Sequence, residues 1–233
     1  MIIKSGNLQA HEAKTLIFIN NETTIPVPKV RKIQYSNGHV TDVHYDQHGK
    51  ATVQYEDHAV TKITMDLVAG QTLEKAWEEM GQDKKDRVAE DLCQYITQLR
   101  KFTADSIGGL DNGPARIVSA MQEVVEGGPF ESEAQFNNFR QSCGVCPAVV
   151  AVDNPIVLTH GDLVPKNILV DDQGHVTGLV DWEFSGYYPL YWEHRRASKD
   201  LTPGWAQFVV QLFPEIYERE YIWGSPVLFG ALI

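Results

Sequence analysis

One segment, residues 159–181, constrains the fold of this chain more than any other. It begins with a loop that places Asp162 and Asn167 five residues apart, and Pro165 excludes a helix between them. Two short β-rich runs follow, separated by Asp-Asp-Gln-Gly, a sequence typical of a hairpin turn. Because a hairpin returns its second strand beside the start of its first, Asp181 is predicted to lie close to Asn167.

These oxygen-bearing side chains have a specific chemical use. The amide of Asn167 and the carboxylate of Asp181 are hard ligands that suit Mg²⁺ bound with substrate phosphates. A further aspartate, Asp162, can accept a proton from a substrate hydroxyl. An isolated Asp-x₄-Asn in a loop is usually turn chemistry, but this loop also carries His160 and Gly161, and an Asp-Trp-Glu sequence ends the hairpin. The combination predicts phosphoryl transfer, in which positioning and charge neutralisation dominate.

The rest of the chain predicts an α+β fold with two lobes, residues 1–67 and 68–233. The first lobe is β-rich, and the second is mainly helical with a pair of strands embedded in it. The predicted strands are 2–4, 40–45, 51–55, 60–67, 156–159, 168–170 and 176–180, and the predicted helices are 10–20, 72–77, 84–102, 115–125, 133–140, 205–212 and 215–223.

Composition narrows the class of partner. The net charge is −11 over 233 residues, which repels nucleic acid. The acidic balance is compatible with a cationic substrate, but it is more often only a solubility feature. No run of eighteen apolar residues is present and the first residues do not form a secretion signal, so we expect a cytoplasmic protein without a membrane span. The sequence gives no indication of oligomeric state.

The three cysteines do not indicate a disulfide framework, because their number is odd. Cys143 and Cys146 have the spacing of half a zinc site or of a redox pair. The additional metal ligands and the βαβ context that those functions need are not evident. We therefore assign no role to this pair.

The motifs resemble those of the aminoglycoside phosphotransferase/choline kinase-like family, and most closely those of its fungal members. The similarity covers most of residues 2–200. It is carried by His160-Gly-Asp-Leu, Asn167-Ile-Leu-Val-Asp, Gly178-Leu-Val-Asp-Trp-Glu and Pro189-Leu-Tyr-Trp-Glu. The resemblance implies a protein-kinase-like fold with two lobes, ATP as co-substrate, Mg²⁺ as cofactor and a small hydroxylated molecule as acceptor.

The resemblance also implies roles for single residues. Asp162 corresponds to the catalytic base, His160 orients the catalytic loop, and Asn167 and Asp181 hold Mg²⁺. On the nucleotide side, Lys4 corresponds to the phosphate-binding lysine and Glu12 to its glutamate partner, while the hinge that faces adenine is formed by Met65, Asp66 and Leu67. We interpret Glu183 and Glu193 as structural anchors and Trp182 and Trp192 as core residues.

One family feature is missing from this sequence. Only three residues precede Lys4, so the two strands and the phosphate-covering loop that the family places there are expected to be absent. Two functions from different classes stay open on this basis. The chain is either an ATP-dependent phosphotransferase or a catalytically impaired, kinase-like binding module. A protein kinase is the weaker alternative, because no Ala-Pro-Glu element follows Asp181.

Overall fold

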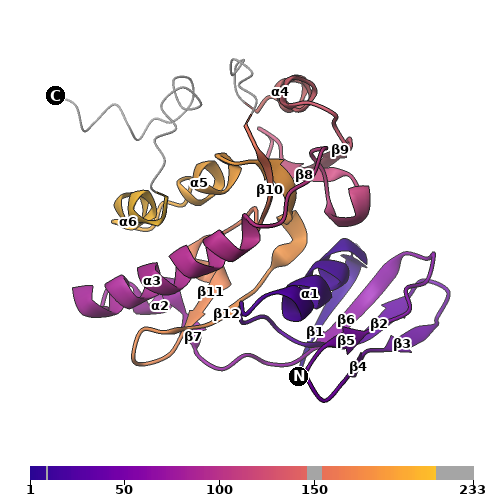
Figure 1. The fold of residues 1–233 in the computed structure, drawn as a ribbon, viewed down its shortest axis with the longest axis horizontal. Helices are drawn as coiled ribbons and strands as arrows, with labels where there is room; N and C mark the ends of the chain where they lie inside the picture. Colours follow the sequence, from indigo (N-terminus) through magenta and orange to yellow (C-terminus); the bar gives the residue numbers. More distant parts are fainter. Residues whose placement is uncertain (9, 146–153, 214–233) are drawn as a thin grey trace.

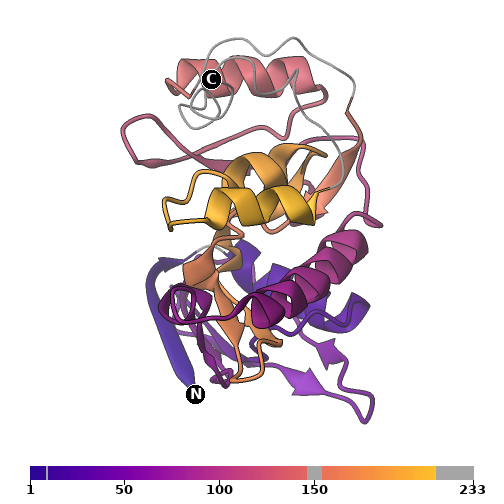
Figure 2. The same cartoon turned by 90° about the vertical axis from the view of Figure 1, so that its left-hand side faces the viewer.

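The computed structural model describes residues 1–8, 10–145 and 154–213. Its strands form antiparallel sheets against which the helices pack, so the fold is α+β, as the sequence predicts (Figure 1). The β-rich first part and the more helical second part lie side by side, and Figure 2 shows the same arrangement from another direction.

The first part is built on a four-stranded sheet in the order β1-β6-β2-β3, with β1 at one edge. Helix α1 covers the predicted helix over 10–20 and buries Ala13, Leu16 and Ile19. The turn at residues 46–49 joins β4 and β5, which lie within the predicted strands 40–45 and 51–55, as a hairpin. The elements are β1 (Ile2–Leu8), α1 (Ala10–Glu22), β2 (Val30–Tyr35), β3 (Val40–Asp42), β4 (His44–Tyr45), β5 (Ala51–Thr52) and β6 (Val60–Met65).

The second part begins after residues 66–70. Its helices are α2 (Leu73–Ala76), α3 (Gln82–Leu99), α4 (Glu133–Ser142), α5 (Trp192–Ala197) and α6 (Trp205–Leu212), with short 3₁₀ turns η1 (Leu110–Asn112), η2 (Pro165–Asn167) and η3 (Trp182–Phe184). Its strands are β7 (Gln71–Thr72), β8 (Ala115–Val118), β9 (Val124–Gly127), β10 (Ile156–Thr159), β11 (Ile168–Val170), β12 (Val176–Leu179) and β13 (Gly186–Pro189).

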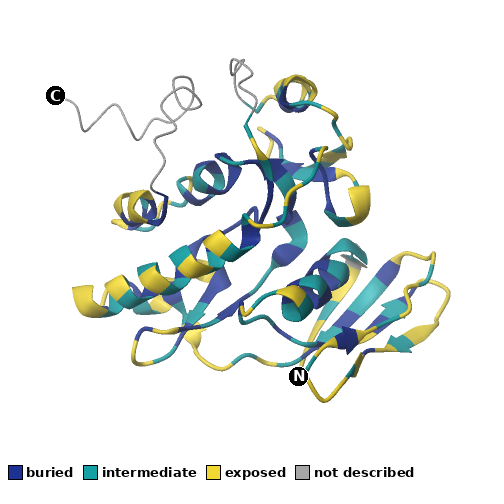
Figure 3. Cartoon of the chain, in the orientation of Figure 1, coloured by how far each residue is buried: buried dark blue, intermediate teal, exposed yellow. Residues whose placement is uncertain are grey.

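Helix α3 shows how the second part is held together. Val88, Leu92, Ile96 and Leu99 recur every three or four residues and are all buried, while the opposite face of the helix is exposed (Figure 3). In the described part of the chain, no helix has the length and apolarity needed to cross a bilayer.

The hairpin predicted from the strands 168–170 and 176–180, which we call the catalytic hairpin, is present. Ile168 lies opposite Leu179 in the β11–β12 pair, and the backbone N–H of Val180 donates to the carbonyl oxygen of Asn167 at 3.0 Å. Strand β11 also pairs with β7, the first strand after residues 66–70. The segment that joins the two parts is therefore fixed to the same sheet as the catalytic loop.

The predicted helix over 115–125 is wrong, because these residues form the β8–β9 hairpin. The β-branched pairs Ile117-Val118 and Val124-Val125 favour strands, and burial alternates along both segments, as it does in a sheet with one covered face. Gln122 turns the chain with a φ of 63°. The predicted helix over 215–223 lies outside the described residues.

Candidate active site

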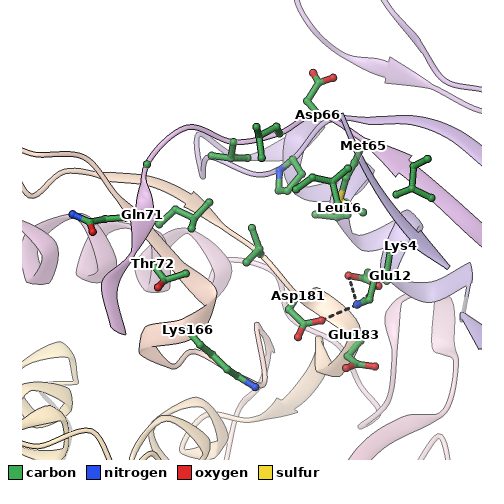
Figure 4. Close-up of a pocket in the computed structure, with 18 of the residues that line it drawn as sticks. Lys4, Glu12, Leu16, Met65, Asp66, Gln71, Thr72, Lys166, Asp181 and Glu183 are labelled. Atoms are coloured by element: carbon green, nitrogen blue, oxygen red, sulfur yellow. Dashed lines mark hydrogen bonds and ion pairs between the residues drawn. The ribbon is translucent and has the colours of Figure 1, made fainter. Parts of the chain in front are cut away.

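A cavity of about 640 Å³ lies between the two parts, bordered by β1, α1, the segment after β6 and the catalytic hairpin (Figure 4). It brings together residues that are far apart in the sequence. All the predicted nucleotide-binding residues and one predicted metal ligand line it: Lys4, Glu12, Met65, Asp66, Leu67 and Asp181.

Lys4 is at the centre of the charged end of this cavity. Its ammonium group lies 2.8 Å from Glu12 Oε2 and 2.8 Å from Asp181 Oδ1 (Figure 4). Burial by itself lowers the pKa of Lys4, but the two carboxylates outweigh burial and raise it. Burial also raises the pKa of Glu12, and the Lys4 cation opposes that change. The three side chains form one ion-pair cluster that joins β1, α1 and the catalytic hairpin.

The predicted hinge residues, Met65, Asp66 and Leu67, differ in which of their groups can contact a ligand. Met65 is buried, whereas the Asp66 carboxylate points away from the cavity and forms a bidentate pair with Arg31 at 2.6 and 2.9 Å (Figure 4). The backbone N–H of Asp66 is also engaged, because it donates to the Lys29 carbonyl at 2.9 Å. A planar ring in the cavity would therefore meet the backbone of Leu67 and the side chain of Met65 rather than any group of the Asp66 side chain.

Asp162 is buried in the loop of residues 160–167, which we call the catalytic loop after its predicted role. Its carboxylate is held from both sides. Asn167 Nδ2 donates to Asp162 Oδ2 at 2.9 Å, and Arg196 Nη2 lies 3.2 Å from Asp162 Oδ1. The Lys166 ammonium group is 3.4 Å from Oδ2 but is mostly exposed. These contacts fix the plane of the carboxylate before any ligand arrives.

His160 acts on Asp162 through the backbone. The Asp162 N–H donates to His160 Nδ1 at 3.2 Å, and His160 Nε2 lies 3.1 Å from the Val180 carbonyl oxygen. These partners require a neutral ring with its proton on Nε2. Burial lowers the pKa of His160, which favours that form. The ring ties the catalytic loop to the residue before Asp181.

Glu193 is a structural anchor, as the sequence predicts. It is buried on α5, and its carboxylate accepts hydrogen bonds from the backbone N–H groups of His160 at 2.5 Å and Gly161 at 3.1 Å. Burial raises its pKa to about 7. Gly161 has a φ of +79°, and a Cβ there would overlap the carbonyl oxygen of Phe184. Trp182 and Trp192 are buried in the core, also as predicted.

The donor set for a metal fits Mg²⁺ held together with nucleotide phosphates. Asn167 uses its amide N–H groups on the Asp162 carbonyl and carboxylate oxygens, both at 2.9 Å, so its side-chain oxygen stays available as an acceptor. Asp181 adopts the left-handed conformation, with φ 65° and ψ 61°, which is uncommon for a residue other than glycine and is often found at functional sites. Within the described ranges, no cluster of three or more His, Cys, Asp or Glu residues could hold a metal by itself.

Three residues of the site were not predicted from the sequence as contacts of these groups. Arg196 contacts Asp162, Lys166 lies beside it, and Arg116 pairs with Glu183 at 3.4 Å. Glu183 lines the cavity with a partly exposed side chain. Arg196 lies three residues after Glu193, which places both on one face of α5 but does not indicate Asp162 as a partner.

The chain matches the family model described as "Phosphotransferase enzyme family" over residues 10–213. A curated relative, the "Clavilactone A biosynthesis cluster protein Y" of Ampulloclitocybe clavipes, is 32% identical over 106 residues. That match covers 45% of this chain but only 23% of the relative. The chain thus corresponds to less than a quarter of that protein's length.

Solved structures show the same fold. The aminoglycoside phosphotransferase APH(4)-Ia is similar with a TM-score of 0.53 and 11% identity, covering 94% of this chain and 70% of that one. A thermostable mutant of the same protein with ADP and hygromycin B gives a TM-score of 0.51, also at 11% identity, over 88% and 66% of the two chains. At this level of identity, the likeness concerns the fold alone.

Proposed function

The chain belongs to the phosphotransferase enzyme family, and from that membership we propose that it transfers the γ-phosphoryl group of ATP to a hydroxyl group of a small molecule. The observation that carries this proposal is the geometry around Asp162. A buried carboxylate is held in a fixed orientation beside an amide, and the same loop is tied to Asp181, which lines a cavity of nucleotide size. We also assign residues 1–67 and 68–233 to the two lobes of a kinase-like enzyme.

In the proposed reaction, ATP lies in the interlobe cavity. Lys4 contacts its phosphates, and Glu12 keeps Lys4 in place. Asn167 and Asp181 would hold Mg²⁺, which neutralises phosphate charge when it is bound. Asp162 accepts the proton of the acceptor hydroxyl as the hydroxyl oxygen forms its bond to the γ-phosphorus. The bond from that phosphorus to the bridging oxygen breaks, and ADP leaves.

The identity of the acceptor is a separate question. The solved relative with hygromycin B is only 11% identical, so its ligand says little about this chain. The fungal relative is named for a biosynthesis cluster, which is consistent with a small metabolite as acceptor. A cytoplasmic location stays a prediction of the sequence.

A second candidate function is nucleotide binding without efficient turnover. The observation that favours it is the exposure of β1. Ile2 and Ile3 line the nucleotide cavity but are 44% and 60% exposed, so the cavity is open on that side. A cavity that is open on this side admits water and holds a nucleotide less firmly.

Asp162→Asn tests the proposed function. The variant keeps the hydrogen bond to Asn167 but cannot take a proton, so ADP formation from Mg·ATP should fall by about a hundredfold or more. ATP binding, measured as the rise in thermal unfolding midpoint, should be unchanged. Equal turnover by the wild-type protein and the variant contradicts the mechanism.

The same midpoint measurement separates the two candidates. Mg·ATP at a hundred times its dissociation constant adds about 2.7 kcal/mol to the free energy of unfolding. A magnesium-dependent rise together with Asp162-dependent turnover supports the phosphotransferase. A rise without turnover supports the binding module.

A further inference from the structure

Arg196 on α5 makes three contacts that the sequence motifs did not predict. Its Nε donates to the Gly161 carbonyl oxygen at 2.9 Å, and its Nη2 lies 3.2 Å from Asp162 Oδ1. The guanidinium carbon stands 5.5 Å from the centre of the Phe184 ring. The side chain is only 13% exposed. Arg196 is therefore fixed against the catalytic loop.

A second cavity, of about 690 Å³, lies beside Arg196. It is bordered by the turn between β8 and β9, by the residues after α4, and by the end of α5 with the residues that follow it. No described residue lines both this cavity and the interlobe cavity. Arg196 lines the second cavity, and its guanidinium contacts Asp162 in the catalytic loop.

The two cavities differ in charge. The interlobe cavity is lined by side chains of both signs, the carboxylates of Glu12, Asp181 and Glu183 and the ammonium groups of Lys4, Lys75 and Lys166. Among the described residues around the second cavity there are three basic side chains, Arg195, Arg196 and Lys199, and no acidic one. Arg195 and Lys199 also take part in other interactions. We call this second space the basic cavity.

Arg196 has hydrogen-bond donors to spare. A guanidinium group carries five N–H donors in a planar fork. One of them, on Nε, serves Gly161, and one of the two on Nη2 serves Asp162. The remaining donors can bind an oxygen atom of a ligand without releasing the catalytic loop. A cation in the same place would be repelled by the guanidinium.

We propose that the basic cavity receives the acceptor of the phosphoryl transfer, and that Arg196 is a positioning residue that holds Asp162 with one nitrogen and an anionic oxygen of the acceptor with another. The inference rests on the proposed function. It names the acceptor class as a hydroxylated compound with a negatively charged oxygen group, rather than an amino sugar. The net charge of the whole chain favours a cationic acceptor instead, so the two acceptor classes predict opposite results in the tests that follow.

Binding selectivity tests the cavity. Gluconate and glucamine share a six-carbon polyol chain and differ at one end, which is a carboxylate in the first and an aminomethyl group in the second. The thermal unfolding midpoint is measured with each compound at equal ionic strength, with Mg·ADP saturating the interlobe cavity. Gluconate should raise the midpoint of the wild-type protein and glucamine should not. The gluconate effect should disappear in Arg196→Met.

The matched control is Arg87→Met, which removes a more exposed guanidinium on α3 that contacts Asp83 and Gln173. This control should keep the gluconate effect. A midpoint that responds equally to gluconate and glucamine, or to neither, overturns the assignment of an anion-selective cavity. If gluconate still raises the midpoint of Arg196→Met, Arg196 does not bind the anion in this cavity.

A double-mutant cycle tests the positioning role. ADP formation from Mg·ATP is measured for the wild-type protein, Arg196→Met, Asp162→Asn and the double variant, with gluconate present. Arg196→Met should lower kcat about tenfold to a hundredfold, while KM for ATP changes by less than about twofold. In the Asp162→Asn background it should cause no further loss, because Arg196 acts through Asp162. Arg196→Lys should recover part of kcat.

The outcomes separate the two proposals. If Asp162→Asn turns over as fast as the wild-type protein, the proposed function fails and the positioning role fails with it. If Asp162→Asn is slow but Arg196→Met is not, only the role of Arg196 is wrong. An equal loss from Arg196→Met in both backgrounds, with no recovery by Arg196→Lys, means that Arg196 supports the fold and not the base.

Discussion

The two sides of the candidate active site are built differently. The catalytic loop is buried and is fixed by short-range hydrogen bonds, such as those that the backbone N–H groups of His160 and Gly161 donate to Glu193. The nucleotide side is held by the ion pairs of Lys4, whose side chain is 33% exposed. Its partners, Glu12 and Asp181, come from different elements of the chain.

This difference shows which side of the site has a fixed geometry before a ligand binds. Buried hydrogen bonds leave a carboxylate few alternative positions, so Asp162, which the side chains of Asn167 and Arg196 hold, is ready before the acceptor binds. Ion pairs between long, partly exposed side chains are worth little to stability and can be exchanged for phosphate oxygens. We therefore expect substitutions in the catalytic loop to affect folding strongly, and substitutions around Lys4 to affect mainly nucleotide binding.

The largest expected effect comes from Gly161→Ala. The position has a φ of +79°, and a Cβ would overlap the Phe184 carbonyl oxygen. Strain of the backbone and overpacking together should lower the free energy of unfolding by about 3–5 kcal/mol. Urea denaturation at neutral pH measures the change.

Gly204→Ala is the matched control for this substitution. Gly204 has the same φ of +79°, but the nearest atom to an added Cβ is 3.9 Å away, on Trp77. The control should cost only about 1–2 kcal/mol, the penalty of the backbone conformation. Equal losses at the two glycines contradict the view that the catalytic loop is tightly packed.

The contribution of Glu193 to the free energy of unfolding should be of intermediate size and should depend on pH. Its folded-state pKa is raised to about 7 from a reference value of 4.5, so the folded state binds its proton more tightly than the unfolded state does. The stability from this group is complete below pH 4.5 and is lost as the pH rises through 7. The total change is about 3 kcal/mol.

Glu193→Gln removes this dependence. As the pH rises from 4.5 to 7, the free energy of unfolding of the wild-type protein should therefore fall relative to that of the variant. Chemical denaturation at several pH values measures it, and Glu78→Gln, at an exposed position, is the control. A constant difference across that range shows that Glu193 is not buried as described.

The smallest effect on stability should come from Lys4→Met. Lys4 and Asp181 are partly exposed, and the buried Glu12, whose pKa burial already raises, can take up a proton once the cation is gone, so we expect a loss of about 1 kcal/mol. The rise in unfolding midpoint caused by Mg·ATP should fall much more, because the phosphates lose their cation. Arg31→Met, which breaks the exposed pair with Asp66 outside the cavity, should leave that rise intact. If Lys4→Met destabilises the protein as much as Gly161→Ala does, the contrast between the two sides disappears.

Much of this site could be predicted because its residues are close in sequence. Asp162, Asn167 and Asp181 belong to one loop and one hairpin, so turn chemistry and strand register are enough to bring them together. The hairpin of β8 and β9 was missed because its valines and isoleucine also fit a helix, and only the covered face decides between the two.

Arg196 was missed for a different reason. Its contact with Asp162 depends on how α5 packs against the catalytic loop, and no local pattern encodes that packing. The pairing of Asp66 with Arg31 likewise could not be deduced, because it depends on which side of the sheet edge the aspartate faces. Contacts between elements distant in sequence are fixed by tertiary packing, which a pattern of residue types does not specify.

The ion pair between Lys4 and Asp181 joins residues 177 positions apart. A ribosome that adds 5–20 residues per second needs roughly 9–35 seconds to synthesise the chain between them. During that time β1 and α1 leave the ribosome without the carboxylate that completes the lysine cluster. A nascent chain therefore cannot assemble the nucleotide side of this site until the catalytic hairpin has been translated.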